Sequence, residues 1–275
     1  MRLGLVGLGL MGASFAAALD RARPKIDRVG IDADPATLAR ALELGLIGEP
    51  GIEGADLIVL AIPPDAMRGV LPRLPRDVLV TDMASTKAKV CAWAAEAELD
   101  FVGGHPMCGR EATGIEAADP DLFQAAPWVL TRADKRVEDL VRAVGAHPVV
   151  MDPERHDRLV AGVSHAAFVL SAAYLLAVAG DADWPELQKL AASGFRDMTR
   201  LAAGSSAMYA GIADTNSENL AGWLRRVEAE IAKLRRHVEE GDPRLGELFE
   251  EARETRDRWL AEQVEPERGR NLRRP

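Results

Sequence analysis

A histidine stands in a glycine-rich stretch of the sequence, where its chemistry could be put to use. The stretch FVGGHPMCGREATGIEAA, residues 101–118, places His105 and Pro106 between glycines. Pro106 disfavours a helix, and a core strand does not need three nearby glycines. We therefore interpret the stretch as a rigid loop that follows a strand. Histidine often serves as a general base because its pKa lies near the working pH of enzymes, so His105 is a candidate proton acceptor.

The other four histidines are weaker candidates for this role. His237 lies in the charged helical segment KLRRHVEEGD, and His147 precedes a proline at the start of a strand. His156 lies in the first turn of a long helix beside charged residues, and we interpret it as a surface or capping residue. His165 lies on an apolar helix face, and composition alone favours a buried core histidine there.

A second set of residues indicates a nucleotide site. The segment GLVGLGLMGASFAAAL, residues 4–19, places Gly7, Gly9 and Gly12 in GxGxxG spacing between a strand and a helix. Such glycines allow a tight turn, the approach of a pyrophosphate to the backbone, and close packing of helix on strand. Asp32 ends the second strand, 20 residues after Gly12, where a carboxylate can bond both ribose hydroxyls. No arginine stands close to Asp32, which favours NAD over NADP.

The segment AIPPDAM after the third strand is expected to line the same cofactor, because ligands bind at the carboxyl ends of such strands. The expected cofactor-binding residues are Gly7, Leu8, Gly9, Leu10, Met11, Gly12, Asp32, Ala61, Ile62 and Pro63.

Alternating strands and helices predict an α/β fold with an N-terminal, Rossmann-type doubly wound sheet. Strands are expected at residues 2–7, 28–32, 56–62, 78–83, 128–131 and 147–151. After Asp152 the strand patterns end, and helical patterns continue. We therefore expect a nucleotide-binding domain over 1–152 and an all-helical domain over 153–275 for substrate binding and dimerisation. Residues 265–275 are charged, without apolar periodicity, and predict a mobile tail.

Composition excludes several classes of protein. The net charge of −9 disfavours nucleic-acid binding. The run HAAFVLSAAYLLAVAG is shorter than a membrane span and is interpreted as a buried helix. Cys91 and Cys108 are too few for a disulfide scaffold, no signal segment is evident, and a cytoplasmic setting is expected. No cluster of side chains has metal-ligand spacing, so we expect no metal.

Several segments, taken in order, resemble one enzyme family. GGHPMCGREATGIEAA is similar to the GxHPMxGxExxGxxxA signature of prephenate and arogenate dehydrogenases, which act in tyrosine biosynthesis. TDMASTKAKV resembles the family's D-x-x-S-x-K segment. MDPERHDRLVAGVSH resembles its passage into the helical domain, and GFRDMTRLA resembles its Gly-Phe-[Lys/Arg]-Asp-x-Thr-Arg helix. The resemblance runs from Arg2 to about residue 240.

The resemblance implies a role for each matching residue. His105 would accept the proton of the substrate's ring hydroxyl as hydride leaves for NAD, and Ser85 would orient that hydroxyl or the nicotinamide. Arg200 would bind a substrate carboxylate, for which its planar fork is suited. The other residues implied on the substrate side are Glu111, which would shape the pocket, Arg196, which would add positive potential or pair with a surface acid, His165 and Tyr209.

Two departures from the family pattern leave the substrate open, and one of them is Ser193, at a position often taken by glycine. Many relatives have Ser-His-x-Pro-His where this chain has SHAAF, so Phe168 replaces a second histidine.

The expected activity is NAD-dependent oxidative decarboxylation of prephenate, with arogenate as the alternative substrate. A dehydrogenase of the β-hydroxyacid type is less favoured, because the first long helix of the helical half offers His165 and no lysine. A non-catalytic NAD-sensing protein would need the glycine loop but not His105, Ser85 and Arg200 together. The resemblance also implies a homodimer through the helical domain.

Overall fold

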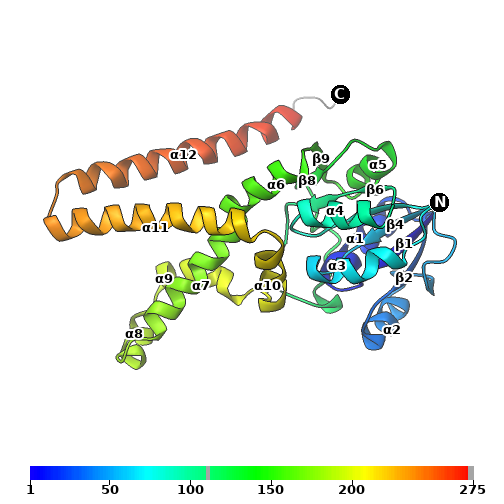
Figure 1. The fold of residues 1–275 in the computed structure, drawn as a ribbon, viewed down its shortest axis with the longest axis horizontal. Coiled ribbons are helices and arrows are strands. Elements are labelled where there is room, and N and C mark those ends of the chain that lie inside the picture. Colours follow the sequence, from blue (N-terminus) through cyan, green and yellow to red (C-terminus); the bar gives the residue numbers. More distant parts are fainter. Residues whose placement is uncertain (110–111, 272–275) are drawn as a thin grey trace. The chain divides into compact units, whose positions relative to one another are not determined.

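A parallel sheet of six strands forms the centre of the N-terminal half (Figure 1). The computed structural model describes residues 1–109 and 112–271, which fall into two compact units, Met1–Ala221 and Gly222–Pro275. The strands of this sheet follow the order β3-β2-β1-β4-β5-β6. They are β1 (Arg2–Val6), β2 (Asp27–Ile31), β3 (Glu49–Pro50), β4 (Leu57–Leu60), β5 (Leu79–Asp82) and β6 (Phe101–Val102).

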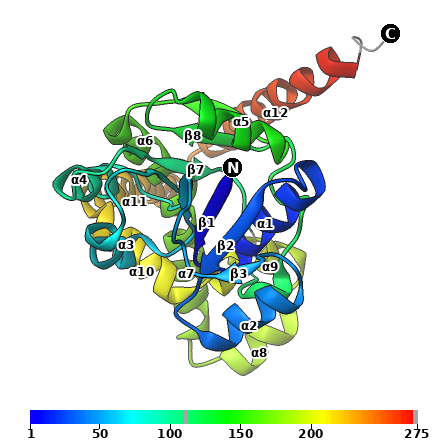
Figure 2. The ribbon, with the colours of Figure 1, turned by 90° about the vertical axis from the view of Figure 1, so that its right-hand side faces the viewer.

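Helices cover both faces of this sheet, as a doubly wound fold requires. Alternate residues of β4 enter different cores: Leu57 and Val59 pack with α1 and α5, whereas Ile58 and Leu60 pack with α3 and α4. Figure 2 shows α1 on one side of β1 and β2, and α3 and α4 on the other. The helices are α1 (Leu10–Ala22), α2 (Pro35–Glu43), α3 (Pro64–Val70), α4 (Ala88–Glu96) and α5 (Lys135–Ala143).

The sequence predicts one sheet, but the last strands of the N-terminal half form a second one. β7 (Gly104–Pro106) pairs antiparallel with β8 (Pro127–Leu130), and β8 pairs parallel with β9 (His147–Val150). His105 therefore lies in a buried strand, opposite Val129, and the prediction of a loop is wrong. The glycines are explained by packing: a Cβ on Gly104 would lie 2.4 Å from the carbonyl oxygen of Asp82, and one on Gly103 would lie 2.8 Å from the Thr131 methyl.

The rest of the first unit is helical, as predicted. The polypeptide enters α6 at Pro153, and the Asp152 side chain caps this helix by accepting from the backbone N–H of Arg155. A π-helical segment joins α6 to α7. The elements are α6 (Pro153–Val160), the π segment (Ala161–His165), α7 (Ala166–Ala179), α8 (Trp184–Leu190), α9 (Ser193–Thr199), a 3₁₀ turn (Arg200–Ala203) and α10 (Ser206–Thr215).

The second unit contains most of α11 (Ser217–Glu240) and α12 (Arg244–Asn271), joined by a turn at Gly241 with a φ of 62°. Helix α12 thus includes the first part of the segment 265–275, for which a mobile tail was expected, and residues 272–275 lie outside the described part of the chain.

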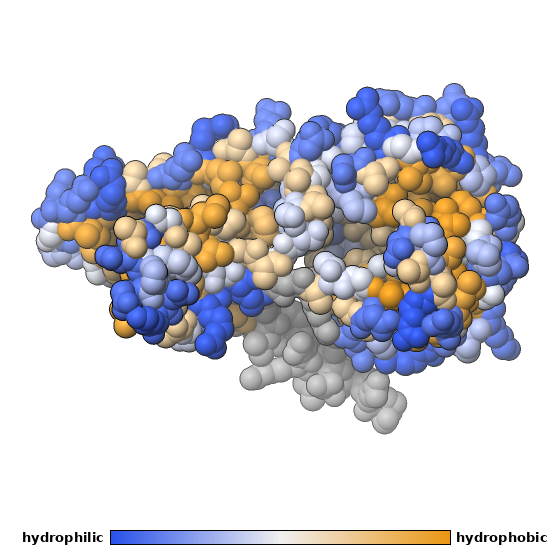
Figure 3. All heavy atoms as spheres, turned by 90° about the horizontal axis from the view of Figure 1, so that it is seen from below, coloured by the Kyte–Doolittle hydropathy of each residue, from blue (hydrophilic) through white to orange (hydrophobic). Residues whose placement is uncertain are grey.

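The apolar helix α7 is not the buried helix that the sequence predicts. Only Ala166 and Ser171 of α7 are buried, and Leu176 is 71% exposed. The segment Pro153–Ala179 is long and apolar enough to cross a membrane, although a packing helix of a soluble protein passes the same test. Apolar residues form patches over the helical part on the face shown in Figure 3. An apolar helix left uncovered by its own chain is typical of a surface that meets another protein.

A buried ion pair connects the end of β5 to β7. The Lys87 ammonium donates to the Asp82 carboxylate and, at 2.7 Å, to the carbonyl of Gly104, next to His105. Asp82 also accepts from the backbone N–H groups of Ala84 (2.9 Å) and Gly104 (2.8 Å). Both charged side chains are fully buried. Burial raises the pKa of Asp82, and the adjacent lysine and these donors counteract that rise by stabilising the carboxylate.

Replacing Lys87 with Met should therefore destabilise the fold by about 3–5 kcal/mol, because the buried carboxylate of Asp82 loses its cation. Urea unfolding at neutral pH measures this. Arg76→Met is the matched control, since Arg76 pairs with Glu98 at the surface, where both side chains are about 70% exposed; its effect should stay within about 0.5 kcal/mol. If the two variants lost the same free energy of unfolding, the buried pair would not support the fold.

Candidate active site

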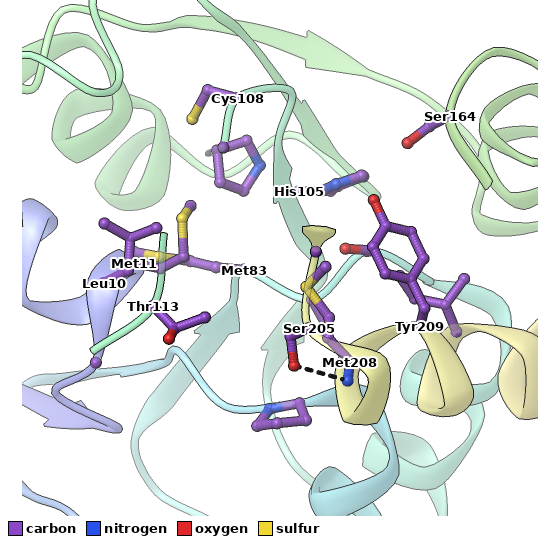
Figure 4. A pocket seen from close by; sticks show the side chains of 18 of the residues that line it. Leu10, Met11, Met83, His105, Cys108, Thr113, Ser164, Ser205, Met208 and Tyr209 are labelled. Atoms are coloured by element: carbon purple, nitrogen blue, oxygen red, sulfur yellow. Dashed lines mark hydrogen bonds between the residues drawn. The ribbon is translucent and has the colours of Figure 1, made fainter. Parts of the chain in front are cut away.

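One cavity of about 630 Å³ lies at the carboxyl ends of the central strands. Its wall joins the glycine loop, the segments that follow β4 and β5, strand β7, and the helical residues from Arg200 to Ile212. In Figure 4, Leu10, Met11 and Met83 lie on one side, Ser164 and Tyr209 lie on the other, and His105 lies between them. The dashed line there marks the cap of α10, in which the Ser205 hydroxyl accepts from Met208 N–H at 3.3 Å. The cavity thus faces both a nucleotide-binding motif and the helical half.

The glycine loop has the geometry that binding of a pyrophosphate requires. Gly7 has a φ of 91°, which favours glycine, and a Cβ on Gly12 would lie 2.0 Å from the carbonyl oxygen of Gly7. A Cβ on Gly9 would meet nothing within 4 Å, so the backbone there is open to a ligand. Asp32 supports the loop by accepting from Leu8 N–H at 2.6 Å.

The residues expected at the cofactor separate into two groups. Those that line the cavity are Gly9, Leu10, Met11, Ala61, Ile62 and Pro63. The others do not line the cavity but form the turn, the helix contact and the hydrogen bond described above; they are Gly7, Leu8, Gly12 and Asp32. The arrangement fits a dinucleotide whose phosphates meet the first amides of α1.

His105 lines the cavity while most of its ring is buried, with only 7% of the residue exposed. Its Nδ1 lies 2.8 Å from Nε2 of His156. Burial, with the nearby His156, Lys87 and His165, lowers the pKa of His105 well below its usual value. The imidazole is consequently neutral near pH 7, which is the form that can accept a proton.

The interpretation of His156 as a surface or capping residue is wrong. His156 is fully buried on α6, and its Nδ1 lies 2.8 Å from Oδ1 of Asp157. The cap of α6 is Asp152. A pattern in the sequence was available: His156, Asp157, Val160 and Ala161 follow helical spacing, and all four are buried on one face of the helix.

The residues expected around the substrate are only partly brought together. Ser85, Arg200 and Tyr209 line the cavity with His105. Arg196 is exposed on α9 and does not line it. Glu111 lies outside the described residues.

His165 instead lines a second, apolar cavity of about 250 Å³, which shares Tyr209 and Ile212 with the first. Its Nδ1 lies 3.3 Å from the side-chain amide of Asn216, and its buried Nε2 finds no hydrogen-bond partner within the described part of the chain. Burial lowers the pKa of His165 to about 4. Between the two cavities the rings of Phe168 and Tyr209 stack with centroids 3.3 Å apart and planes within 8°. Phe168, which lines the second cavity, thus places an aromatic ring against Tyr209 where many relatives have a histidine.

Sequence reasoning missed some residues that the structure places at the site. Asp157 stands behind His156, and Ser164 lines the first cavity from the π-helical segment. Inserted π turns shift the register of the following side chains and are frequent at functional sites. Here the insertion presents Ser164 to one cavity and His165 to the other. No local pattern in the sequence marks this insertion.

A doubly wound sheet with a glycine loop, facing a helical half across a shared cavity, defines a nucleotide-dependent dehydrogenase of two-part build. Comparison with known families then identifies which one. The nucleotide-binding domain of prephenate dehydrogenase matches residues 15–147, and the dimerization domain of prephenate dehydrogenase matches residues 152–252. The chain belongs to the prephenate dehydrogenase family, and the resemblance seen in the sequence is confirmed.

Individual relatives agree with this assignment. The prephenate dehydrogenase of Bacillus subtilis is 32% identical, over 92% of this chain and 74% of its own. The crystal structure of prephenate dehydrogenase from A. aeolicus, in complex with hydroxyphenyl propionate and NAD+, superposes with a TM-score of 0.87 at 29% identity and covers 94% and 98% of the two chains. The Synechocystis arogenate dehydrogenase gives a TM-score of 0.77 at 31% identity and covers 94% and 100%. Relatives with either substrate in their names are therefore similar to this chain.

The glycine geometry leads to a paired prediction. Gly12→Ala places a methyl group against the Gly7 carbonyl and should destabilise the fold by about 3 kcal/mol. Gly9→Ala adds a methyl group at the open cavity wall, so its melting temperature should stay near that of the wild type while NAD binding weakens. Thermal melts and titration with NAD, followed by tryptophan fluorescence, separate the two effects. If Gly9→Ala bound NAD as tightly as the wild type, the loop would not be the cofactor site.

Proposed function

We propose that this protein is a prephenate dehydrogenase, which uses NAD to convert prephenate to 4-hydroxyphenylpyruvate and carbon dioxide. The observation that carries the proposal is that the glycine loop, His105, Ser85 and Arg200 all line the same cavity, the one of about 630 Å³. These are the parts that the reaction needs: a nucleotide site, a base, a polar group to orient the hydroxyl, and a cation for a carboxylate. A protein that only sensed NAD would have no need of the last three.

NAD, when bound, accepts the hydride. Asp32 supports the choice of NAD over NADP, because its carboxylate ends β2 close to the glycine loop and a ribose 2′-phosphate would be repelled by it. The exposed residues that follow, Ala33 and Asp34, supply no positive charge, and Asp34 is engaged in capping α2.

His105 is proposed to take the proton of the ring hydroxyl as hydride leaves the same carbon. Its lowered pKa keeps it neutral before the reaction, so a lone pair is available at neutral pH. Ser85 stands after β5, at the same wall, and is proposed to hold the hydroxyl in line. Loss of carbon dioxide from the oxidised ring then gives an aromatic product, and this step needs no additional base.

Arg200 is proposed to bind a carboxylate of the substrate, through a planar fork that suits two oxygens. It follows α9, one turn after Arg196, and belongs to the 3₁₀ turn Arg200–Ala203. Because Arg196 does not line the cavity, we propose that it contributes only to the potential around the entrance.

The aromatic pair Phe168–Tyr209 is the observation that supports prephenate over arogenate. Arogenate carries an ammonium group that needs a hydrogen-bonding or anionic partner. Among the described lining residues Arg200 is the charged one, and Glu111, the carboxylate that the resemblance implies at this pocket, lies outside the described residues. Tyr209 lines the same cavity, and its ring is stacked on that of Phe168. An ammonium group would meet a cation and aromatic carbon there, whereas the side chain of prephenate ends in a keto acid.

Measuring NADH formation with each substrate, and with NADP in place of NAD, tests the proposal. We expect kcat/KM for prephenate with NAD to exceed that for arogenate by roughly 10-fold or more, which corresponds to about 1.4 kcal/mol for one unpaired ammonium group. Phe168→His restores the residue of many relatives and is the matched variant. It should reduce the ratio of kcat/KM for prephenate to kcat/KM for arogenate. Turnover of neither substrate would refute the function, and a preference for arogenate would refute the substrate assignment.

We also propose that the helical half forms a homodimer. One support is the match to a dimerization domain. The other is the segment from Val163 to Leu176, whose apolar side chains are left uncovered: Val163 is 77% exposed and Leu176 is 71% exposed. Light scattering at micromolar concentration should give twice the chain mass. Leu176→Glu, with a charge in this surface, should shift the protein toward monomer; a wild type that is monomeric at this concentration would exclude the dimer.

A further inference from the structure

A chain of buried hydrogen bonds runs from His105 away from the cavity. Nδ1 of His105 lies 2.8 Å from Nε2 of His156, and Nδ1 of His156 lies 2.8 Å from Oδ1 of Asp157. The two imidazoles meet edge to face, with centroids 5.0 Å apart and planes at 79°. His156 and Asp157 are at most 1% exposed, so water does not compete for these bonds.

Asp157 determines the direction of the hydrogens along this chain. Its Oδ1 accepts from Lys87 N–H at 2.7 Å, and its Oδ2 accepts from Ala88 N–H at 2.9 Å, at the start of α4. With donors on both oxygens, the ionised carboxylate is an acceptor only. His156 must therefore donate from Nδ1, and as a neutral imidazole it has a lone pair at Nε2.

The same reasoning extends to His105. With His156 neutral before the reaction, its Nε2 is an acceptor, and Nδ1 of His105 carries the proton and donates to it. The Nε2 of a neutral His105 is then left with a lone pair. The structure thereby selects one tautomer of the base, and the selection originates at a carboxylate two residues along the hydrogen-bond chain.

We propose that His156, held by Asp157, is a positioning residue that keeps His105 in the tautomer with a bare Nε2 and takes over its Nδ1 proton when Nε2 is protonated. The catalytic part rests on the proposed function. As the hydroxyl O–H bond breaks, an N–H bond forms at Nε2 of His105; its Nδ1–H bond breaks as one forms at Nε2 of His156. His105 ends neutral, and His156 becomes an imidazolium beside the Asp157 carboxylate. The hydride and both its electrons go to NAD.

The charges around the two rings favour this transfer. His105 faces Lys87, His156 and His165, and it has no carboxylate among the groups that perturb its pKa. His156 is in direct contact with Asp157. Lys87 is paired with Asp82, and burial lowers the pKa of His165 to about 4, so His165 is neutral near pH 7. A positive charge is therefore better placed on His156 than on His105.

The tautomers can be tested without substrate. In ¹⁵N-histidine-labelled protein without ligands, NMR should show His105 and His156 protonated at Nδ1, whereas free imidazole side chains in water prefer protonation at Nε2. His105→Asn assigns the signals. His156→Phe should return His105 to the Nε2-protonated form, and His156→Gln, whose amide oxygen can accept, should keep it at Nδ1. An Nε2-protonated His105 in the wild type would overturn the proposal even if the enzyme turns over prephenate.

Kinetics then test the proton transfer. His156→Phe should lose at least about 100-fold in kcat, because it provides neither the acceptor nor the proton site. His156→Gln should recover part of that loss, since it restores the tautomer but cannot take a proton. Affinity for NAD should be unchanged in both. His237→Gln, which alters a histidine paired with Asp242 in the second unit, should match the wild type. Equal activity of His156→Phe and wild type, or of the Phe and Gln variants, would refute the relay.

Discussion

The carboxylate of Asp157 is the contact on which the site depends. From α6 it accepts from the first amides of α4, and so a helix of the helical half caps a helix of the nucleotide-binding half. Its backbone carbonyl accepts from the Asn216 amide at 2.8 Å, beyond the end of α10. A further bond, between the hydroxyls of Thr86 and Thr215, follows the same seam. Because these partners are buried, the two halves cannot separate here without leaving polar groups unsatisfied.

The difference between local and long-range contacts explains which features the sequence could predict. The glycine loop is local: a strand, a turn and the start of a helix adjoin in the chain, so spacing alone indicates its geometry. The cap of α2 by Asp34 is local as well, because its side chain accepts from the backbone N–H groups of Ala36 and Thr37 in the next turn. The strand that contains His105 is not local, because β7 depends on β8 more than 20 residues later. Its glycines permit contact with Asp82 and Thr131, and a sequence cannot reveal contacts of that kind.

The error about His156 has the same physical origin. A histidine beside Arg155, Asp157 and Arg158 resembles a solvated helix face, and Arg155 and Arg158 are in fact exposed. What buries His156 is a partner 51 positions earlier in the chain. The resemblance to the family located His105, Ser85 and Arg200 at one cavity, but it did not reveal the hydrogen bonds behind them. The resemblance concerns residue types, whereas the tautomer of a base depends on the direction of each donor.

The net charge of the buried network gives a reason for its composition. Lys87 and Asp82 neutralise one another, so in the proposed resting state, with the His105 and His156 rings both neutral, Asp157 is the remaining charge among these five side chains. A proton that arrives at His105 alone would place a cation near Lys87 in a medium of low polarity. A proton that ends at His156 instead forms a pair with Asp157, and the network becomes neutral. Burial, which disfavours net charge, then works in favour of proton acceptance rather than against it.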